Sequence, residues 1–497
     1  MLSKSKYCSF VQCPRNLWLG KYHPEEAAED AALESRLKEG NEVGDLAMRL
    51  FGDYTEVTVF TEDGRLDLSE MIRRTAELMK KGADVICEAS FSYLGNYCAV
   101  DILRREAGGY AIYEVKSSTH AKDVYATDIA YQKFVLTRCG VNVSGTYLVC
   151  VNSSYVFDGE LDLSGLFRVI DMAREVDGKY PFVEGNIAEA CRVLTCESEP
   201  DCDISERCND PYSCVFFGHC TAHLPKPSVF DVYSMKFKKQ LDYYRRGIVS
   251  FEDLANDKPT RKNKIRSLQV SHALADLPTH IDRDGIREYL DGLSFPLYFL
   301  DFETMRPIVP PFVGTRPYMQ IPFQYSLHYV ECEGGELKHK EFLAESGVDP
   351  RRAIAERLCE DIPRGACVLA YNKSFECSRI HELSDLFPDL CEHLRDIEGN
   401  IRDLIDPFQA GYYYNRAMGN SFSIKSVLPA IYPNDPSLDY HNLEGVHNGS
   451  EAMAIFPEIK NMPPEKAKEA RRNLLKYCEL DTFAMVKVWE ELVRVTR

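Results

Sequence analysis

One stretch of the sequence combines two acidic residues and a lysine in a pattern that suits metal-dependent chemistry. In CAVDILRREAGGYAIYEVKSST, Gly108 and Gly109 predict the turn of a β-hairpin, with Asp101 on its first strand and Glu114 and Lys116 on its second. Glu114 and Lys116 share a face because side chains alternate along a strand. Two carboxylates and an ammonium suit phosphodiester hydrolysis, in which the carboxylates hold Mg²⁺ or Mn²⁺ and the lysine orients water or stabilises developing charge. The alternative is an ordinary ion pair on a solvated strand.

A second set of acidic residues lies in the C-terminal half. PLYFLDFET predicts a buried strand with Asp301 and Glu303 on one face, an arrangement that is costly unless a cation or proton relieves it. ACVLAYNKSFECSRI predicts a strand followed by a helix that carries Glu376. EKAKEARRNLLKYCELDTFAMVKVWEEL predicts an amphipathic helix on which Tyr477 and Asp481 share a face. Asp481 would complete a metal site and Tyr477 would orient the attacking water, whereas each residue alone is also typical of an ordinary strand end or helix surface.

Further acidic and polar residues flank the hairpin. They are Glu42 in EGNEVGDLA, Glu88 in VICEASFSY, and Asp128, Tyr131 and Gln132 in the helical segment DIAYQKFVL. With the hairpin, this order resembles the PD-(D/E)XK nucleases of the RecB type, close to the CRISPR-adaptation exonucleases. The resemblance implies that Asp101, Glu114 and Lys116 form the metal site and that Gln132, with Tyr131, belongs to the helix that follows it.

Two positions depart from the pattern of that family. Val100 stands where the family has a proline before the aspartate. The upstream metal-binding histidine of the family has no match here, and Glu42 is its substitute among the candidate metal ligands, to which Glu88 is added.

The cysteines form a second pattern. The chain has 18 cysteines. In a reducing compartment, a cluster such as the one within residues 191–220 indicates metal binding. Five residues separate Cys208 from Cys214 and Cys214 from Cys220, a wider spacing than in the usual ligand pairs of zinc fingers. With the distant Cys13, they resemble the iron–sulfur staple of the same nuclease branch, also seen in AddB-type enzymes. The resemblance implies that these four cysteines hold a 4Fe–4S cluster, with Zn²⁺ as the fallback. Four others remain alternatives: Cys8, Cys191, Cys196 and Cys202.

The C-terminal acidic set resembles the DnaQ-like DEDDy 3′–5′ exonucleases, which have an RNase H-like fold. The positions that match are Asp301, Glu303, Tyr477 and Asp481. Glu376 stands where the family has aspartate, and its extra methylene moves the carboxylate by about 1.5 Å. Asp403, in NIRDLIDPF, is the fallback ligand.

Strand and helix patterns alternate in both halves, which predicts an α/β fold class. We expect a first domain over residues 1–225, a charged helical connecting module over 226–290, and a second domain over 291–497. By resemblance, the first is a restriction-endonuclease-like domain with the cysteine cluster and the second an RNase H-like exonuclease domain. The whole chain resembles a prokaryotic family that joins these two nucleases.

The net charge and the hydropathy of the sequence limit the kinds of partner that we expect for this protein. The net charge of −18 argues against a protein that binds nucleic acid non-specifically. It does not exclude a nuclease, because divalent ions bound in an acidic site reverse the local electrostatic field. The sequence has no apolar run long enough to span a bilayer, and its N-terminus lacks the apolar core of a signal peptide. We therefore expect a cytoplasmic protein without a membrane partner.

The expected function is hydrolysis of phosphodiester bonds at two metal-dependent sites. DNA is the favoured substrate, as single strands or ends, in repair or phage defence. An RNA-processing exonuclease and a non-catalytic iron–sulfur scaffold that binds nucleic acid are the alternatives. The sequence predicts neither the polarity of cleavage nor the oligomeric state.

Overall fold

The computed structural model describes residues 1–29 and 33–497. It has a mixed α/β fold in two compact units, the first comprising residues 1–223 and 307–318, and the second residues 224–306 and 319–497. Residues 226–290, expected as a separate connecting module, belong to the second unit. In the described ranges, none of the helices has both the length and the apolar composition needed to cross a membrane.

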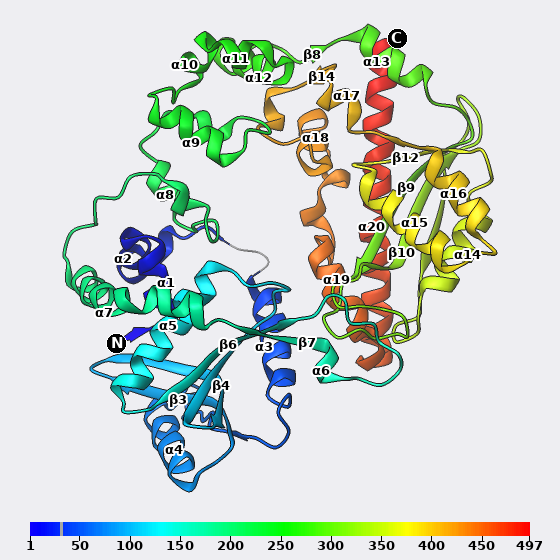
Figure 1. Ribbon diagram of the computed structural model, residues 1–497. Coiled ribbons are helices and arrows are strands. Elements are labelled where there is room, and N and C mark those ends of the chain that lie inside the picture. Colours follow the sequence, from blue (N-terminus) through cyan, green and yellow to red (C-terminus); the bar gives the residue numbers. More distant parts are fainter. Residues whose placement is uncertain (30–32) are drawn as a thin grey trace. The chain divides into compact units, whose positions relative to one another are not determined.

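The first unit contains a seven-stranded sheet in the order β2-β3-β4-β5-β6-β7, with β1 paired to β4 (Figure 1). Its strands are β1 (Leu2–Ser3), β2 (Thr55–Glu56), β3 (Val85–Tyr93), β4 (Asn96–Glu106), β5 (Gly109–Lys116), β6 (Val143–Val151) and β7 (Phe167–Asp171). The hairpin predicted around Asp101 and Glu114 is the antiparallel pair β4–β5, and its turn contains Gly108 with a φ of 91°. A positive φ of this kind favours glycine.

Helices cover both faces of this sheet. They are α1 (Lys4–Gln12), α2 (Pro14–Tyr22), α3 (Leu33–Ala47), α4 (Leu68–Lys81), α5 (Asp123–Arg138), α6 (Leu163–Leu166), α7 (Ala173–Thr195) and α8 (Phe217–Thr221). Ile129 of α5 shares a core with Ile112 of β5, whereas Val43 of α3 shares another core with Tyr113 of the same strand. Because side chains alternate along β5, Glu114 lies on the face that α5 covers.

The second unit has a five-stranded sheet in the order β11-β10-β9-β12-β13. The strands are β9 (Leu297–Met305), β10 (Ile321–Val330), β11 (Lys338–Leu343), β12 (Cys367–Ala370) and β13 (Ile401–Asp403), and a small separate sheet pairs β8 (His280–Ile281) with β14 (Tyr413–Tyr414). The pairs β11–β10 and β10–β9 are antiparallel, and the pairs β9–β12 and β12–β13 are parallel.

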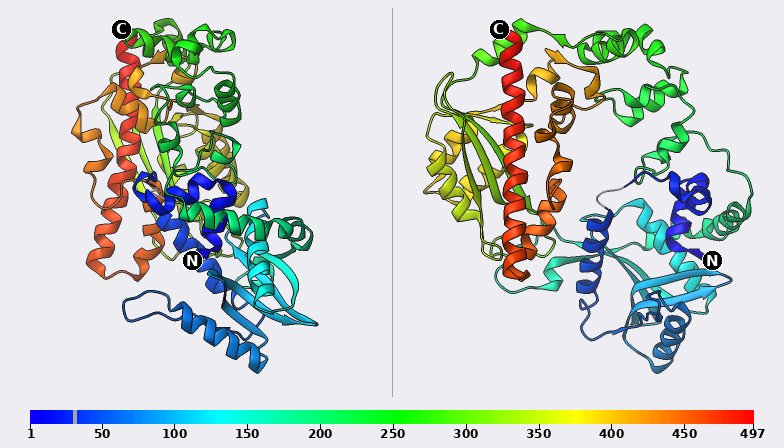
Figure 2. Two further views of the ribbon diagram at one scale, coloured as in Figure 1. Left: turned by 90° about the vertical axis from the view of Figure 1, so that its left-hand side faces the viewer. Right: turned by 180° about the vertical axis from the view of Figure 1, so that it is seen from behind.

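Helices of the second unit pack on this second sheet or on one another. They are α9 (Phe237–Arg245), α10 (Phe251–Asn256), α11 (Lys258–Lys262), α12 (Lys264–Ala275), α13 (Arg283–Asp291), α14 (Arg351–Asp361), α15 (Ser374–Leu386), α16 (Cys391–Gly399), α17 (Asp406–Gln409), α18 (Ile424–Ile431), α19 (Gly449–Glu458) and α20 (Pro464–Thr496). Helices α14, α15 and α16 pack on one face and α20 runs along the other (Figures 1 and 2). Leu300 and Phe302 of β9 enter the core beneath α14–α16, so the alternate residues Asp301 and Glu303 lie on the α20 side.

Candidate functional sites

Strand β9 and helix α20 bring the C-terminal acidic residues together. Oxygen atoms of Asp301 and Glu303 and the sulfur of Cys478 lie within 4.8 Å of one another. Removal from water raises the pKa of Asp301 well above its usual value, and the charges of Asp481, Glu303 and Glu376 raise it further. Each of the other three predicted carboxylates therefore lies close enough to Asp301 to repel it.

The other carboxylates of this group also hold protons more tightly than usual. Burial and repulsion by Asp481 raise the pKa of Glu303 to about 8, and burial raises that of Asp481 to about 6. Burial and the charge of Asp403 raise the pKa of Glu376 to about 8. Carboxylates crowded in this way are relieved by protons or by a divalent cation.

Glu376 and Asp403, the two candidates for one ligand position, differ in how their oxygens are used. Asp403 ends β13, and its carboxylate accepts backbone N–H groups from Asn372 at 2.8 Å, Lys373 at 2.9 Å and Ile405 at 3.2 Å. Glu376, in the first turn of α15, is buried, and its Oε2 has no hydrogen-bond partner among the described residues. Asp403 thus holds the turn that leads into α15, whereas Glu376 keeps an oxygen for a ligand.

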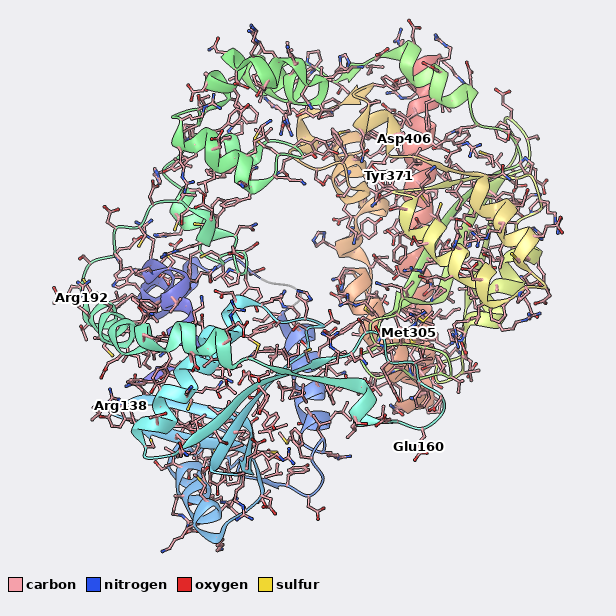
Figure 3. The ribbon with its side chains drawn as sticks, in the orientation of Figure 1. Arg138, Glu160, Arg192, Met305, Tyr371 and Asp406 are labelled. Atoms are coloured by element: carbon pink, nitrogen blue, oxygen red, sulfur yellow. The ribbon has the colours of Figure 1, made fainter. Side chains whose placement is uncertain are left out.

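A pocket of about 480 Å³ opens beside this carboxylate group. Asp301 and Asp481 line it together with Asn372, Lys425 and Tyr371. Tyr371, which follows β12 and is labelled in Figure 3, donates a hydrogen bond to the carbonyl of Phe422 at 2.6 Å. The pocket therefore gives access to the acidic group.

Tyr477 is accompanied by two residues that the sequence analysis missed, Lys425 and Tyr440. The Tyr440 hydroxyl donates to Asp481 Oδ1 at 2.7 Å. Lys425 Nζ lies 3.4 Å from the Tyr477 hydroxyl, and its charge lowers the pKa of both Glu303 and Asp481. Neither residue stands in a motif with the acidic groups, so only the chain path through α18 and the segment before α19 places them here.

In the first unit, Glu114 is completely buried in a set of charged partners. Lys4 Nζ donates to it at 2.9 Å, Gln132 Nε2 at 2.7 Å and Lys116 Nζ at 2.5 Å. Lys116 also donates to Asp128 at 3.1 Å, as does Gln132. The candidates Gln132 and Lys116 thus both contact Glu114, and Lys4, which the sequence analysis did not name, contacts it as well.

The carboxylates of this first site differ in the direction in which their pKa values are shifted. Burial raises the pKa of Glu114, but the charges of Lys116 and Lys4 outweigh burial and hold the pKa well below its usual range. Burial and the charge of Glu114 raise the pKa of Asp101 to about 6, and burial and the charge of Asp101 raise that of Glu88 to about 8. Asp101 and Glu88 therefore hold their protons more tightly than usual, and a divalent cation could take the place of those protons.

The backbone explains how Asp101, Glu88 and Lys4 reach one place. Asp101 Oδ2 accepts the Val115 N–H at 2.6 Å, and its Oδ1 lies 3.5 Å from Lys4 Nζ. Glu88 lies in the middle of β3 with a φ of 56°, where the pairing with β4 leaves out Glu88 and the opposite Asp101. Pairing of Leu2 with Asn96 holds the start of the chain beside β4, and α1 then begins with Lys4.

Two other candidates of the first unit occupy different surroundings. Glu42 is exposed on α3. Tyr131 is buried, stacks on Tyr7 with ring centroids 4.8 Å apart, and donates to the Leu2 carbonyl at 2.7 Å. Tyr131 therefore anchors the N-terminal strand.

Five cysteines line one small pocket at α1, α2 and α8. They are Cys13, Cys202, Cys208, Cys214 and Cys220. The four expected from the sequence are thus joined by Cys202, which had been only an alternative although it precedes Cys208 by the same spacing. Arg15 and Asn16 donate to the sulfurs of Cys220 and Cys214 at 3.7 and 3.6 Å. The contact with Arg15 lowers the pKa of Cys220, but burial outweighs it and raises the pKa of both thiols.

The comparison with protein families adds one finding. A family model described as a domain of unknown function (DUF2779) matches residues 298–423. The match includes Asp301, Glu303, Glu376 and Asp403, and it ends before α20 with Tyr477 and Asp481. No curated protein matches the chain.

Proposed function

We propose that this protein is a nuclease with two sites that depend on divalent metal ions, one in each unit, and that DNA is preferred over RNA. The observation that carries the proposal is the group of Asp301, Glu303, Glu376 and Asp481 beside a pocket. Oxygen ligands of this kind suit Mg²⁺ or Mn²⁺. The mixed five-stranded sheet is compatible with the RNase H-like fold that the resemblance implies.

In the second unit, Asp301 is the central ligand because its pKa responds to all three other carboxylates. A bound Mg²⁺ or Mn²⁺ supplies polarisation of the phosphate and a more acidic water. Tyr477, which lies 3.4 Å from Lys425 Nζ, would orient that water, and the Lys425 ammonium would stabilise negative charge on the phosphate. The orphaned Oε2 of Glu376 supports its assignment as a ligand despite the longer side chain.

In the first unit, Asp101, Glu88 and Glu114 would hold the metal, and Lys116 would stabilise charge on the phosphate. Gln132 and Asp128 keep Glu114 and Lys116 in position through hydrogen bonds of 2.7 and 3.1 Å. Lys4 neutralises Glu114 in the metal-free protein and would share that carboxylate with the ion.

The direct test is cleavage of end-labelled single-stranded DNA and RNA in Mn²⁺ by protein purified without oxygen. We expect DNA to be shortened and RNA to be cut more slowly. Preferential cleavage of RNA would favour the RNA-processing alternative. Tight binding of DNA without any cleavage would reject the nuclease and leave the non-catalytic scaffold.

We also propose that the cysteine pocket holds a 4Fe–4S cluster. A single tetrahedral Zn²⁺ with bonds of about 2.3 Å needs its four sulfurs about 3.8 Å apart. Among the described residues, no three of the cysteine sulfurs in the pocket lie within 4.8 Å of one another. The wider separation of the sulfurs and the presence of five thiols favour a 4Fe–4S cluster rather than a single Zn²⁺. The cluster would connect Cys13, near the start of the chain, to residues 202–220.

Replacing Cys208 by serine should remove most of the iron, sulfide and visible absorbance from protein purified without oxygen. The serine lacks the soft sulfur ligand that iron prefers. The matched control is Cys191→Ser, because Cys191 is exposed on α7 and outside the pocket. Equal iron in both variants would remove Cys208 from the ligands, because Cys202 leaves four thiols in the pocket, and wild-type protein that contains zinc alone would contradict the cluster.

Thermal stability without divalent ions should fall as the pH rises from about 6 to about 8. Asp481 has a pKa raised to about 6, and Glu303 and Glu376 have pKa values raised to about 8. The folded state therefore binds more protons than the unfolded state in this range, and stability is lost as these protons leave. The test is a set of melting curves at several pH values, with chelator and with Mn²⁺. Mn²⁺ should weaken the dependence of the melting temperature on pH. The same pH dependence in chelator and in Mn²⁺ would contradict the prediction.

A further inference from the structure

Two histidines and a glutamate in the second unit form a cluster separate from the acidic group. His328 of β10 and His339 of β11 are directly paired across the antiparallel strands, and their ring centroids are 4.5 Å apart. Glu479 of α20 completes the cluster, since one ligand atom from each of the three residues lies within 4.8 Å of the others. His328 is buried and Glu479 is exposed, so the cluster runs from the interior to the surface.

Both imidazole rings are held by one pair of hydroxyl groups. His328 Nδ1 lies 2.8 Å from Thr482 Oγ1, and His339 Nε2 lies 2.9 Å from Ser326 Oγ. The two hydroxyls are themselves 2.7 Å apart. If each held nitrogen donates to its hydroxyl, the other nitrogen of each ring carries a lone pair. Metal-binding histidines are commonly oriented by a hydrogen bond of this kind from the second nitrogen.

We propose that His328, His339 and Glu479 bind one divalent ion of the class that prefers nitrogen ligands, with Zn²⁺ as its chief member. The ligands would be Nε2 of His328, Nδ1 of His339 and a carboxylate oxygen of Glu479, with water in the fourth position. Three protein ligands and one open position are a common arrangement for Zn²⁺.

This site differs in chemistry from the acidic group beside it. Asp301 pairs with Ser326, two residues before His328 on β10, so the two groups lie on the same side of the sheet. The acidic group offers oxygens, which suit Mg²⁺ or Mn²⁺, whereas two imidazoles and one carboxylate suit Zn²⁺. The proposal does not depend on nuclease activity.

The position of Thr482 gives the site a structural consequence. Thr482 follows Asp481 on α20, and its hydroxyl contacts both Ser326 and His328 of β10. An ion held by Glu479 and the two histidines would therefore fasten this turn of α20 to the β10–β11 pair. We expect bound Zn²⁺ to raise the melting temperature.

The test is a Co²⁺ titration of the full chain, freed of metal and kept without oxygen. Co²⁺ takes Zn²⁺-type sites and reports its ligands by absorbance, so binding by thiolates of the cysteine pocket is distinguished from binding by imidazoles. We expect His339→Ala and Glu479→Gln each to lose one equivalent of thiolate-free Co²⁺, with affinity lowered by at least about 100-fold.

Two variants serve as controls. His381→Ala removes an exposed histidine that lies on α15 beside Glu398, and Asp301→Asn alters the acidic group. Both should keep the Co²⁺ equivalent that the first two variants lose. The same stoichiometry and spectrum in all four variants would overturn the site. His339 and Glu479 are not fully buried, and melting curves without metal establish that each variant is folded.

Discussion

Asp301→Asn will lower cleavage at the second site by at least about 10³-fold, which corresponds to about 4 kcal/mol of lost transition-state stabilisation. Asp301 interacts with Glu303, Glu376 and Asp481 and borders the pocket, so no neighbouring carboxylate can take its central position. The amide keeps the shape of the side chain but removes the charge that binds a cation. The measurement is the single-turnover rate on end-labelled single-stranded DNA in Mn²⁺.

The same substitution should make the metal-free protein more stable at high pH, because it removes one of several repelling charges. Loss of activity together with unchanged or higher stability therefore separates catalysis from misfolding. Asp406→Asn is the matched control: Asp406 is an acidic residue at the start of α17, labelled in Figure 3, and does not line the pocket. Full second-site cleavage by Asp301→Asn would reject this site as catalytic.

Lys116→Met will lower cleavage at the first site by about 10²-fold to 10³-fold, the usual cost of removing one group that stabilises charge in the transition state. Methionine retains most of the length of lysine but has no charge. Lys4 also donates to Glu114, at 2.9 Å, so this buried carboxylate keeps a cationic partner in the variant. The variant is therefore expected to fold.

Lys133→Met is the matched control for this prediction. Lys133 lies on α5 next to Gln132, but its ammonium pairs with the exposed Asp177 at 2.7 Å and does not contact Glu114. The product patterns of Lys116→Met and Asp301→Asn should differ, with each variant losing the products of its own unit. Identical product patterns in both variants would mean that one site performs all the cleavage. Unchanged cleavage in the double variant would show that neither site is catalytic.

Short-range patterns in the sequence predicted the elements that carry the acidic residues. The hairpin of Asp101 and Glu114 follows from alternation and a glycine turn, and it is present as β4–β5. The placement of Tyr477 and Asp481 on one long helix follows from helical periodicity, and that helix is α20. These features depend on residues a few positions apart, so the local sequence contains the information that determines them.

Contacts between distant segments were not predictable in this way. Lys4 reaches Glu114 because β1 pairs with β4, and Lys425 reaches Tyr477 through the packing of α18 beside α20. The place of Glu88 opposite Asp101, where the β3–β4 pairing leaves out both residues, is likewise a property of the paired strands. In the sequence, a lysine or glutamate far from a motif cannot be distinguished from any other charged surface residue, because its sequence neighbours do not indicate which residues it contacts in the fold.

The sequence by itself therefore determined which residue types could do chemistry and which local elements carry them. The tertiary structure decided which of those residues meet, how their charges are balanced, and that Cys202 joins the cysteine pocket while Glu42 stays exposed on α3. The physical reason is that electrostatic and metal-ligand interactions act over a few ångströms of space. Only folding converts distance along the chain into such proximity.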